Sequence, residues 1–396
     1  MPRGIKAIIN PALLQWARKS AGYNLADIAK LVDQTEECVG SWESGEDHPT
    51  IAQMRKIANK LKRPLAVFYL PRVPEDFDTL RDLRRFPDGK SIAYSPKLRL
   101  LIRNIQSQQQ WAAEFRKDHD AARCRFIGRA NLTTDITSLA KKTRSLLNAT
   151  LEEQASWKNY DSALRNWIDK CEEAGVFVFQ SSEVLLEEMR GCSFPDEYAP
   201  AILLNSKDTT SARIFTLFHE FAHLLLNENG VSNLNFVEHA HTSEQLIEVF
   251  CNGLAAEILV PRQELSTLWK NLDTPKDADA NILRFSKRFF VSREVIARRL
   301  RDIGFITNGY YEKKRVQYQR EYLELKDKDK KNKGWAPLYR IIVKNNGREF
   351  SRTVLIAYAD GDIYGRDVSE LLGTKLKHLD DIKHAVFAGF QGDSLQ

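Results

Sequence analysis

Residues 215–226 read FTLFHEFAHLLL, an apolar segment that contains the pattern His-Glu-x-x-His at positions 219–223. On a helix, residues i and i+4 lie on the same face about one turn apart, so His219 and His223 are spaced to bind one Zn²⁺ ion together. Glu220 lies beside this pair, where a carboxylate can take a proton from water whose pKa a metal lowers toward ~7. The apolar neighbours favour a buried helix, and such a helix does not bury these polar groups without partners. The segment therefore predicts a zinc site with a catalytic carboxylate.

A second apolar helix further along the chain offers the third protein ligand that such a zinc site needs. Glu248 follows His223 by 25 residues, and Asn252 follows Glu248 at i+4, on the same face. Glu244 and Glu257 are competing carboxylates. We expect Glu248 to be the ligand, partly on the family resemblance described below. We expect Asn252 to orient a ligand by a hydrogen bond, with an ordinary exposed amide as the alternative.

Three further residues have side chains that bind metals. His239 and His241 lie in the polar stretch VEHAHTSEQ, which is typical of a solvated loop. Cys192 precedes the apolar run PAILLN. A thiolate at Cys192 would fill the open metal position and hold the enzyme inactive, whereas a small buried thiol is the simpler interpretation, which we favour.

The first 70 residues predict four short helices with tight turns between them. Apolar residues recur at helical spacing in 11–21, 25–32 and 51–61, and Thr35 is suited to cap a helix between the last two. Four short helices with tight turns around the second and third are the pattern of a helix-turn-helix DNA-binding domain.

The rest of the chain is predicted to be mostly helical with a few strands. Helical patterns cover 96–118, 133–148, 157–173, 211–227, 243–259 and 277–304. Short apolar runs at 176–180 and 200–205 are typical of strands. Two more runs, 338–344 and 353–358, flank Asn345-Asn346-Gly347, which is a hairpin signal, and 368–379 predicts a closing helix.

These patterns predict an α+β fold that is mostly helical. We expect an N-terminal helix-turn-helix bundle at 1–70 and a zincin-like metallopeptidase domain with a small sheet at 71–312. A charged linker is predicted at 313–335, and a small α+β module at 336–396. The Pro-rich, charged stretch after residue 70 is the expected connection between the first two domains.

Composition limits the class of protein. The chain has 396 residues, and 59 Lys+Arg against 53 Asp+Glu give a net charge of +6, which permits a nucleic-acid contact without requiring one. The hydrophobic share of 43% excludes a disordered or collagen-like chain. Five separated cysteines without a CxxC pair argue against a disulfide framework or a zinc knuckle. No signal segment and no run of 18 apolar residues occur, so we expect a cytoplasmic protein with no membrane partner.

Three ordered motifs resemble the ImmA/IrrE metallopeptidases: FTLFHEFAHLLL, then IEVFCNGLAAEILVP, then FFVSREVIARRLRDIGFI. The resemblance covers roughly residues 77–306. It implies that His219, His223 and Glu248 bind one zinc ion and that Glu220 is the catalytic base. Many relatives have a second acid two residues before the Asn; here that position is Phe250, which supports Glu248 over nearer candidates.

The stretch 25–61 resembles XRE-type helix-turn-helix domains, above all in Trp42-Glu43-Ser44-Gly45-Glu46 and Pro49-Thr50. In that fold the third helix enters the major groove, so the residues that would face the bases are Gln34, Thr35, Glu36, Glu37 and Ser41. Two acids there are unfavourable beside phosphates, although Glu accepts a hydrogen bond from cytosine. The alternatives are DNA binding and a retained fold used for protein contacts or dimerisation.

The segment 284–301 holds seven basic residues and one acid. One interpretation is a patch that binds a nucleic acid or another anion. The other, which we favour, is a solvated basic helix face.

Together these features predict a cytoplasmic regulator that is a zinc-dependent metalloendopeptidase. The resemblance implies cleavage of a helix-turn-helix repressor or a partner protein, with release of genes of a mobile element or a stress response. Expected partners are that protein substrate, DNA through the N-terminal domain, a neighbouring toxin or repressor, and a second copy in a homodimer. The alternative is a DNA-binding transcriptional regulator or antitoxin whose zincin fold senses or scaffolds without cleaving.

Overall fold

The computed structural model describes residues 5–73, 95–228, 230–232, 242–272, 277–329 and 336–387, and these fall into two compact units. The first unit holds residues up to 73 together with 95–107, and the second holds the described residues from 108 onward. No helix in the described ranges is long and apolar enough to cross a bilayer.

The first unit contains the predicted helix-turn-helix bundle. Its helices are α1 (Pro11–Ser20), α2 (Leu25–Val32), α3 (Glu36–Ser44) and α4 (Ile51–Lys60), followed by the 3-10 helix η1 (Leu65–Tyr69). Thr35 caps α3 as predicted, since its hydroxyl accepts a hydrogen bond from the backbone N–H of Cys38 at 3.3 Å. Trp42 is buried in the core of the bundle. Arg18 and Glu43 form a double ion pair with both N–H···O distances at 2.7 Å.

The first half of α5 (Pro96–Asp118) belongs to the same unit as this bundle. Arg103 donates a hydrogen bond to the carbonyl of Leu61 at 2.9 Å, which fastens the start of α5 to the end of α4.

A small sheet organises the second unit. Its strands are β1 (Phe177–Ser181), β2 (Gly191–Phe194), β3 (Ala201–Asn205) and β4 (Gly230–Ser232), in the spatial order β1-β3-β2-β4. The β1–β3 pair is parallel, and β2 is antiparallel to both β3 and β4. The predicted strands at 176–180 and 200–205 are thus confirmed within a residue, while β2 and β4 escaped prediction.

Helices cover one face of this sheet with a continuous apolar core. The helices are α6 (Ile136–Leu146), α7 (Leu151–Ser156), α8 (Tyr160–Glu173), α9 (Thr210–Leu226) and α10 (Ser243–Leu259). Val178 and Ile202 of the sheet share one buried cluster with Trp167 of α8 and Phe218 of α9. Because side chains alternate along a strand, Phe177 and Phe179 of β1 face the other way.

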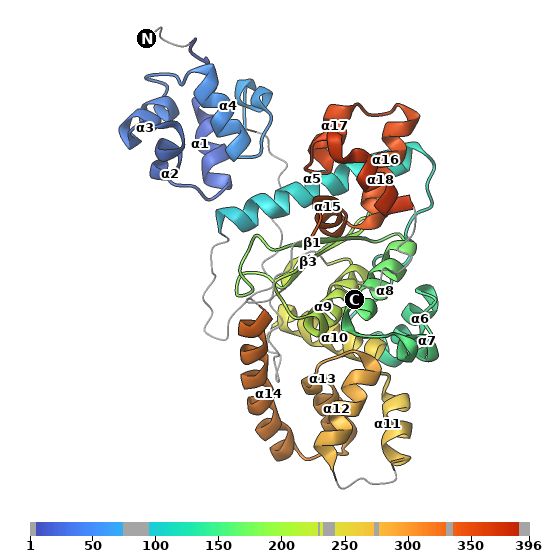
Figure 1. Ribbon diagram of the computed structural model, residues 1–396. Helices are drawn as coiled ribbons and strands as arrows, with labels where there is room; N and C mark the ends of the chain where they lie inside the picture. The colour runs from blue at the N-terminus through green and yellow to red at the C-terminus, as the bar shows by residue number, and fades with distance from the viewer. Residues whose placement is uncertain are drawn as a thin grey trace. The chain divides into compact units, whose positions relative to one another are not determined.

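The opposite face of β1 is covered by C-terminal helices (Figure 1). Phe350 of α16 (Arg348–Asp360) packs edge-on against Phe177, with ring centroids 5.6 Å apart, and lies 5.2 Å from Phe179. Trp111, in the second half of α5, contacts the same Phe350 ring at 5.9 Å. The sheet is therefore the middle of three layers.

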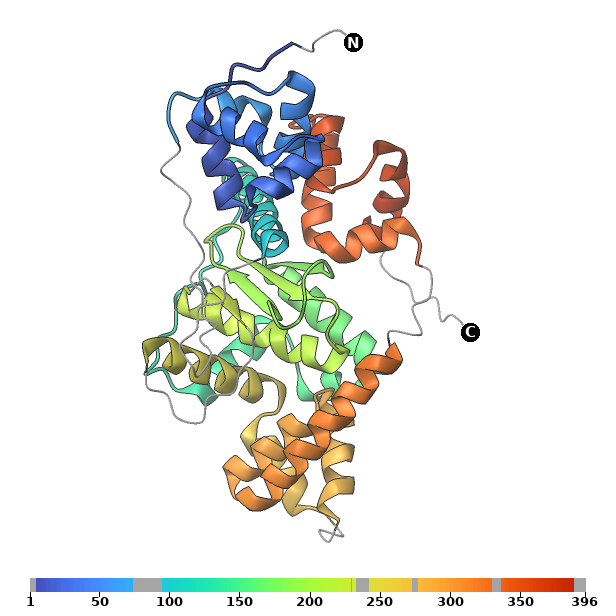
Figure 2. The ribbon, with the colours of Figure 1, turned by 90° about the vertical axis from the view of Figure 1, so that its left-hand side faces the viewer.

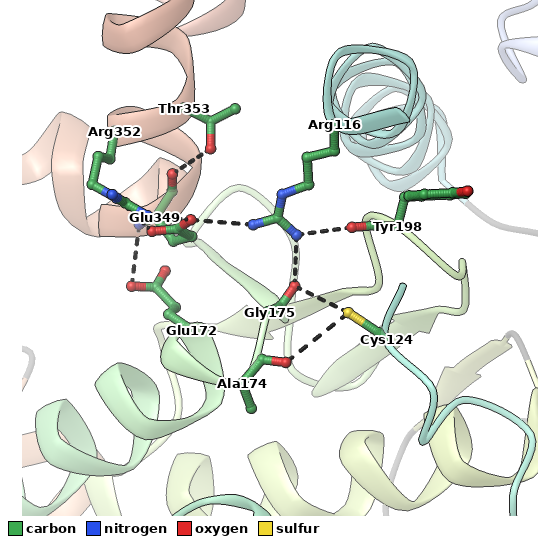
Figure 3. A network of polar contacts seen from close by, with 9 residues as sticks. All are labelled: Arg116, Cys124, Glu172, Ala174, Gly175, Tyr198, Glu349, Arg352 and Thr353. Atoms are coloured by element: carbon green, nitrogen blue, oxygen red, sulfur yellow. Dashed lines mark hydrogen bonds and ion pairs between the residues drawn. The ribbon is translucent and has the colours of Figure 1, made fainter. Parts of the chain in front are cut away.

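Polar contacts reinforce the outer layer (Figure 3). Arg116 of α5 donates to the carbonyls of Gly175 at 2.9 Å and Tyr198 at 2.8 Å, and its guanidinium also contacts Glu349 at 3.2 Å. The backbone N–H of Glu349 donates to Glu172 at 3.3 Å, so a carboxylate of α8 caps the start of α16.

The predicted hairpin near the C-terminus is wrong. Residues 338–346 and 348–360 form α15 (Leu338–Asn346) and α16, and the predicted closing helix is divided among α17 (Gly365–Leu371), η2 (Leu376–His378) and α18 (Leu379–Phe387). The chain does turn at Gly347, whose φ of 78° suits glycine. The turn, however, joins two helices and not two strands. The predicted α+β module is therefore helical over residues 336–387.

The helices α11 (Arg262–Lys270), α12 (Ala278–Phe289), α13 (Arg293–Ile303) and α14 (Asn308–Asp329) complete this unit, and α14 runs alongside α13 (Figure 2). Residues 313–329 of the predicted linker are thus helical, and Tyr318 is buried and donates to Asp279 at 2.8 Å. The rest of that predicted linker, 330–335, lies outside the described residues. The fold class as a whole, mostly helical with a helix-turn-helix bundle and a small sheet, is confirmed.

Candidate metal centre

Helix α9 carries the His-Glu-x-x-His pattern through the middle of the second unit. Thr209 caps its first turn, and Asn227 ends it in the left-handed conformation with φ 57°. The side chains of His219, Glu220 and His223 are fully buried. The apolar residues around them form the core cluster, so the helix is held on all sides, as the sequence predicted.

Helix α10 packs against α9 (Figure 1). This packing brings Glu248 to the two histidines. A capping box between Thr242 and Gln245 fixes the start of α10. The two carboxylate oxygens of Glu248 lie 3.3 Å from Nε2 of His219 and 3.3 Å from Nε2 of His223. Among the described residues, these three form the group of side chains suited to hold a metal ion.

The spacing of the three side chains fits a tetrahedral ion. The two Nε2 atoms of His219 and His223 are 3.1 Å apart. In a tetrahedral site with bonds of ~2.0–2.1 Å, neighbouring ligand atoms lie about 3.3 Å apart. The separation of the two Nε2 atoms is close to this value. Glu248 contacts each imidazole at 3.3 Å through a different carboxylate oxygen, and one ligand atom from each of the three residues lies within 4.8 Å of the others. Two imidazoles and one carboxylate also make a donor set typical of a zinc site with an open fourth position.

Asn252 orients one of the histidines. Its Oδ1 lies 3.1 Å from Nδ1 of His219. Because an amide oxygen only accepts, this contact places the proton of a neutral His219 ring on Nδ1 and leaves the Nε2 lone pair for a metal ion. The contact is the one expected of a residue that fixes the tautomer and direction of a ligand.

Charge and burial oppose each other in this group. Burial alone would raise the pKa of Glu248, but the charges and hydrogen bonds of the two imidazoles lower it below its ordinary range. Burial lowers the pKa of His219, and the Glu248 carboxylate more than compensates, so the pKa of His219 is raised. The group thus holds a negative charge where two imidazoles converge, which suits a divalent cation.

The competing carboxylate Glu257 is engaged elsewhere. It forms an ion pair with Arg299 and accepts a hydrogen bond from the backbone N–H of Arg262 at 3.0 Å. Glu244 lies in the first turn of α10, apart from the metal-binding group. His239 and His241 lie outside the described residues.

Cys192 does not join the metal-binding group. It is buried in β2 opposite Leu203, and its Sγ contacts the carbonyl of Ser193 at 3.9 Å. The preceding residue, Gly191, faces α9, so the alternation along the strand directs Cys192 to the other face. The structure therefore agrees with the buried thiol that we favoured and not with the alternative of an inhibitory thiolate.

Gly191 is the site neighbour that sequence reasoning missed. A Cβ built on Gly191 would lie 2.5 Å from Oε1 of Glu220, so the strand backbone touches the carboxylate of the motif. The only signal in the sequence was a glycine before the short mixed stretch Cys-Ser-Phe, which is too common to identify such a contact.

The residues predicted to read DNA lie together on the first unit. Gln34, Thr35, Glu36 and Glu37 are exposed at the start of α3, whereas Ser41 is half-buried and its hydroxyl donates to the carbonyl of Cys38 at 2.8 Å. The two acids in the first turn of α3 also stabilise the positive end of the helix dipole.

The basic segment 284–301 is largely neutralised by acids. Five of its arginines form ion pairs with carboxylates: Arg288 with Glu264, Arg293 with Glu321, Arg298 with Glu294, Arg299 with Glu257, and Arg301 with Asp302. Three of these pairs join neighbouring helices, whereas the pairs of Arg298 and Arg301 lie within α13. The basic side chains therefore have structural partners, which favours the helix-face interpretation over a nucleic-acid patch.

Comparison with known families agrees with the two units. Residues 171–301 match the model of the IrrE N-terminal-like domain, peptidase M78, and residues 14–68 match a helix-turn-helix model. Neither curated proteins nor solved structures gave a match. The first match spans α9 and α10 with the metal-binding group, and the second spans α1 to α4. The chain therefore contains a region that matches a helix-turn-helix domain and a second region that is similar to the IrrE N-terminal-like domain, peptidase M78.

Proposed function

We propose that the chain is a zinc metalloendopeptidase. The observation that carries the proposal is the group of His219, His223 and Glu248, in which two imidazole nitrogens lie 3.1 Å apart and each lies 3.3 Å from one carboxylate oxygen. Two imidazoles and a carboxylate suit a zinc ion with an open fourth position. A scaffold that does not cleave has no use for a further buried acid at Glu220, directly beside the group.

Each residue has a distinct task in this proposal. The zinc ion, when bound, supplies Lewis acidity for the peptide carbonyl and for a water molecule. His219, His223 and Glu248 hold the ion, and Asn252 keeps His219 in the tautomer that can bind it. Glu220 takes a proton from the attacking water and later gives it to the leaving amine nitrogen. Burial of the two histidines and the two glutamates strengthens their electrostatic interactions.

We infer that the substrate is a helix-turn-helix repressor or a partner protein encoded beside this one, and that the chain works as a cytoplasmic regulator. The helix-turn-helix domain of the chain itself supports this inference, because such domains commonly recognise DNA or assemble with similar domains. The protease would then act where its own first unit binds.

Co-expression with the repressors and other proteins encoded beside the gene tests the peptidase proposal. Wild type is compared with Glu220→Gln, using the intact mass of each candidate substrate and the zinc content of the purified protein. The expected result is a discrete fragment with wild type only, and one zinc per chain in both proteins. A fragment that also forms with Glu220→Gln, or a wild type that binds no zinc, contradicts the proposal.

DNA binding is the second candidate function, favoured by the helix-turn-helix match and by the exposure of Gln34 and Thr35 at the start of α3. Selection of bound sequences from random duplexes tests it. If the domain instead serves as a protein-contact surface, no DNA sequence should be enriched. In that case the affinity for DNA should also not fall when Gln34 is replaced by Ala.

A further inference from the structure

The backbone of β2 lies against the carboxylate of Glu220. A Cβ on Gly191 would lie 2.5 Å from Oε1 and 2.8 Å from Cγ of Glu220. Ordinary carbon contacts are about 3.5–4.0 Å, so no larger residue fits while Glu220 keeps this rotamer. Gly191 does not have a positive φ, and its backbone therefore does not require glycine. What requires glycine here is the space that the Glu220 side chain fills.

The strand cannot move away to make room. Gly191 pairs with Leu204 on one side and with Ser232 on the other, and β2 is an inner strand of the sheet. The neighbouring Arg190 forms an ion pair with Asp208 at 2.5 Å. Asp208 also accepts a hydrogen bond from Tyr322 of α14 at 2.6 Å.

The helix cannot move away either. Asp208 precedes Thr209, the cap of α9, and accepts the backbone N–H of Thr209 at 2.9 Å. The same carboxylate therefore fixes the start of β2 and the start of α9. Apolar residues of α9 are fully buried in the core on their remaining sides. Strand and helix thus form a rigid frame around Glu220.

We propose that Gly191 is a positioning residue for Glu220. Because Gly191 has no side chain, the carboxylate of Glu220 has room beside β2. A larger residue at position 191 would fill this room and displace the carboxylate from the position in which it can exchange protons with water. This inference rests on the proposed peptidase function and gives a strand residue outside the zinc-binding motifs a role in the reaction.

The variant Gly191→Ala has two separable effects. Its Cβ would also lie 2.5 Å from the Cγ2 methyl of Thr216, one turn before Glu220 on α9. Thr216→Ser removes that methyl group and keeps the hydroxyl. The double variant Gly191→Ala/Thr216→Ser therefore relieves the packing conflict and leaves the conflict with Glu220. Gly309→Ala is a matched control, because a Cβ on Gly309 meets no atom within 4 Å.

Zinc content and the affinity for acetohydroxamate are the two readouts. Acetohydroxamate binds a zinc ion, and its hydroxyl proton is accepted by a neighbouring carboxylate, so its Kd reports the position of Glu220 without a protein substrate. We expect the double variant to bind one zinc per chain and to bind acetohydroxamate at least tenfold more weakly than wild type, and we expect the same loss of affinity for Glu220→Gln. Gly309→Ala should match wild type.

A double variant with wild-type hydroxamate affinity overturns the inference and leaves the peptidase proposal intact. Loss of zinc from the folded double variant also overturns it, because Gly191 would then act on the ligands. A wild type that binds neither zinc nor hydroxamate overturns the peptidase proposal, and the inference with it.

A thermodynamic cycle keeps the inference testable when Gly191→Ala alone unfolds. Glu220→Ala removes Cγ and the carboxylate, and with them the atoms that a Cβ on Gly191 would meet. Gly191→Ala is therefore introduced into two proteins, Thr216→Ser and Glu220→Ala/Thr216→Ser. It should lower the melting temperature less in the protein that also carries Glu220→Ala. Equal losses in the two backgrounds contradict a contact between Gly191 and Glu220.

Discussion

Gly347 and Glu172 are in such close contact that a Cβ on Gly347 would lie 2.5 Å from Oε1 of Glu172. The same Cβ would lie 2.8 Å from the carbonyl oxygen of Val178 in β1. The turn between α15 and α16 is therefore seated directly on α8 and on the sheet that supports the metal-binding helix. This contact attaches the C-terminal helices to the rest of the second unit.

Replacing Gly347 by Ala should destabilise the protein strongly. Its φ of 78° and ψ of 155° are accessible to glycine and strained for alanine, and the new Cβ would overlap two atoms. We expect a loss of about 3 kcal/mol in the free energy of unfolding, measured by urea denaturation.

Gly361 is the matched control for that change. It has a φ of 85° at the end of α16, and a Cβ there meets no atom within 4 Å. Gly361→Ala should cost about 1 kcal/mol, from backbone strain alone. Equal losses for the two variants would show that the contact with Glu172 contributes nothing.

Glu172 should make stability depend on pH. Complete burial, together with repulsion from Asp169, raises the pKa of Glu172 well above its ordinary value. A carboxyl group with a raised folded-state pKa holds its proton in the folded state, so its stabilising effect is full at low pH and is lost as pH rises toward that pKa. Glu172→Gln keeps an acceptor for the Glu349 N–H and should be more stable than wild type at pH 8 by about 1 kcal/mol or more.

Urea titrations at pH 5, 6, 7 and 8 measure this difference. Glu173→Gln is the control, since Glu173 is the exposed neighbour of Glu172 on the same helix. Parallel pH curves for wild type and Glu172→Gln would rule out this role for Glu172.

Zinc should stabilise the second unit, because the three ligands join α9 to α10. At a free zinc concentration 100 times Kd, the expected gain is about 2.7 kcal/mol. A chelator should therefore lower the melting temperature of wild type, and added zinc should restore it. Glu248→Gln should bind zinc weakly and show little response, whereas Glu244→Gln, one turn earlier on α10, should behave like wild type. A response that survives Glu248→Gln argues for different ligands.

Truncating Glu43 should destabilise the helix-turn-helix unit. Its carboxylate makes both hydrogen bonds to the Arg18 guanidinium, and the two side chains are only 6% and 10% exposed. Glu43→Ala leaves a buried cation without its carboxylate and should cost about 3 kcal/mol. Amide hydrogen exchange should accelerate in α1–α4 and stay unchanged in α9. The exposed Glu46 is the control, and an equal effect of Glu46→Ala would contradict this account.

Long periodic segments allowed the sequence to predict much of the fold. The helix at 96–118 begins and ends at the predicted residues, and Thr35 caps α3 as expected. Short segments were harder to interpret. The run at 338–344 looks like a strand, but three consecutive apolar residues such as Ile341–Val343 have the same appearance on a buried helix. The strand β2 has only four residues and starts with glycine, so its composition gives almost no strand signal.

The metal-binding group was easier to predict than its surroundings. His219 and His223 are four residues apart on one helix, so their proximity is local. Glu248 was selected with help from a family motif, and the structure brings it to both histidines. The contact between Gly191 and Glu220 comes from packing between a strand and a helix, and no local pattern records it. The direction of the Cys192 side chain could not be predicted from the sequence either. It depends on which neighbouring residue of β2 faces α9, and this is set by the packing of the strand against the helix.

The three-layer arrangement also has a consequence for the timing of biosynthesis. The ribosome delivers the sheet and α9 well before α15 and α16, so Phe177 and Phe179 leave the exit tunnel without the Phe350 ring that covers them. A nascent chain therefore carries the His-Glu-x-x-His helix beneath a strand that lacks the Phe350 ring, although the guanidinium of Arg116 in α5 already lies 4.0 Å from the centroid of the Phe177 ring. The C-terminal helices complete the cover of β1 only after the strands and the metal-binding helix have been synthesised.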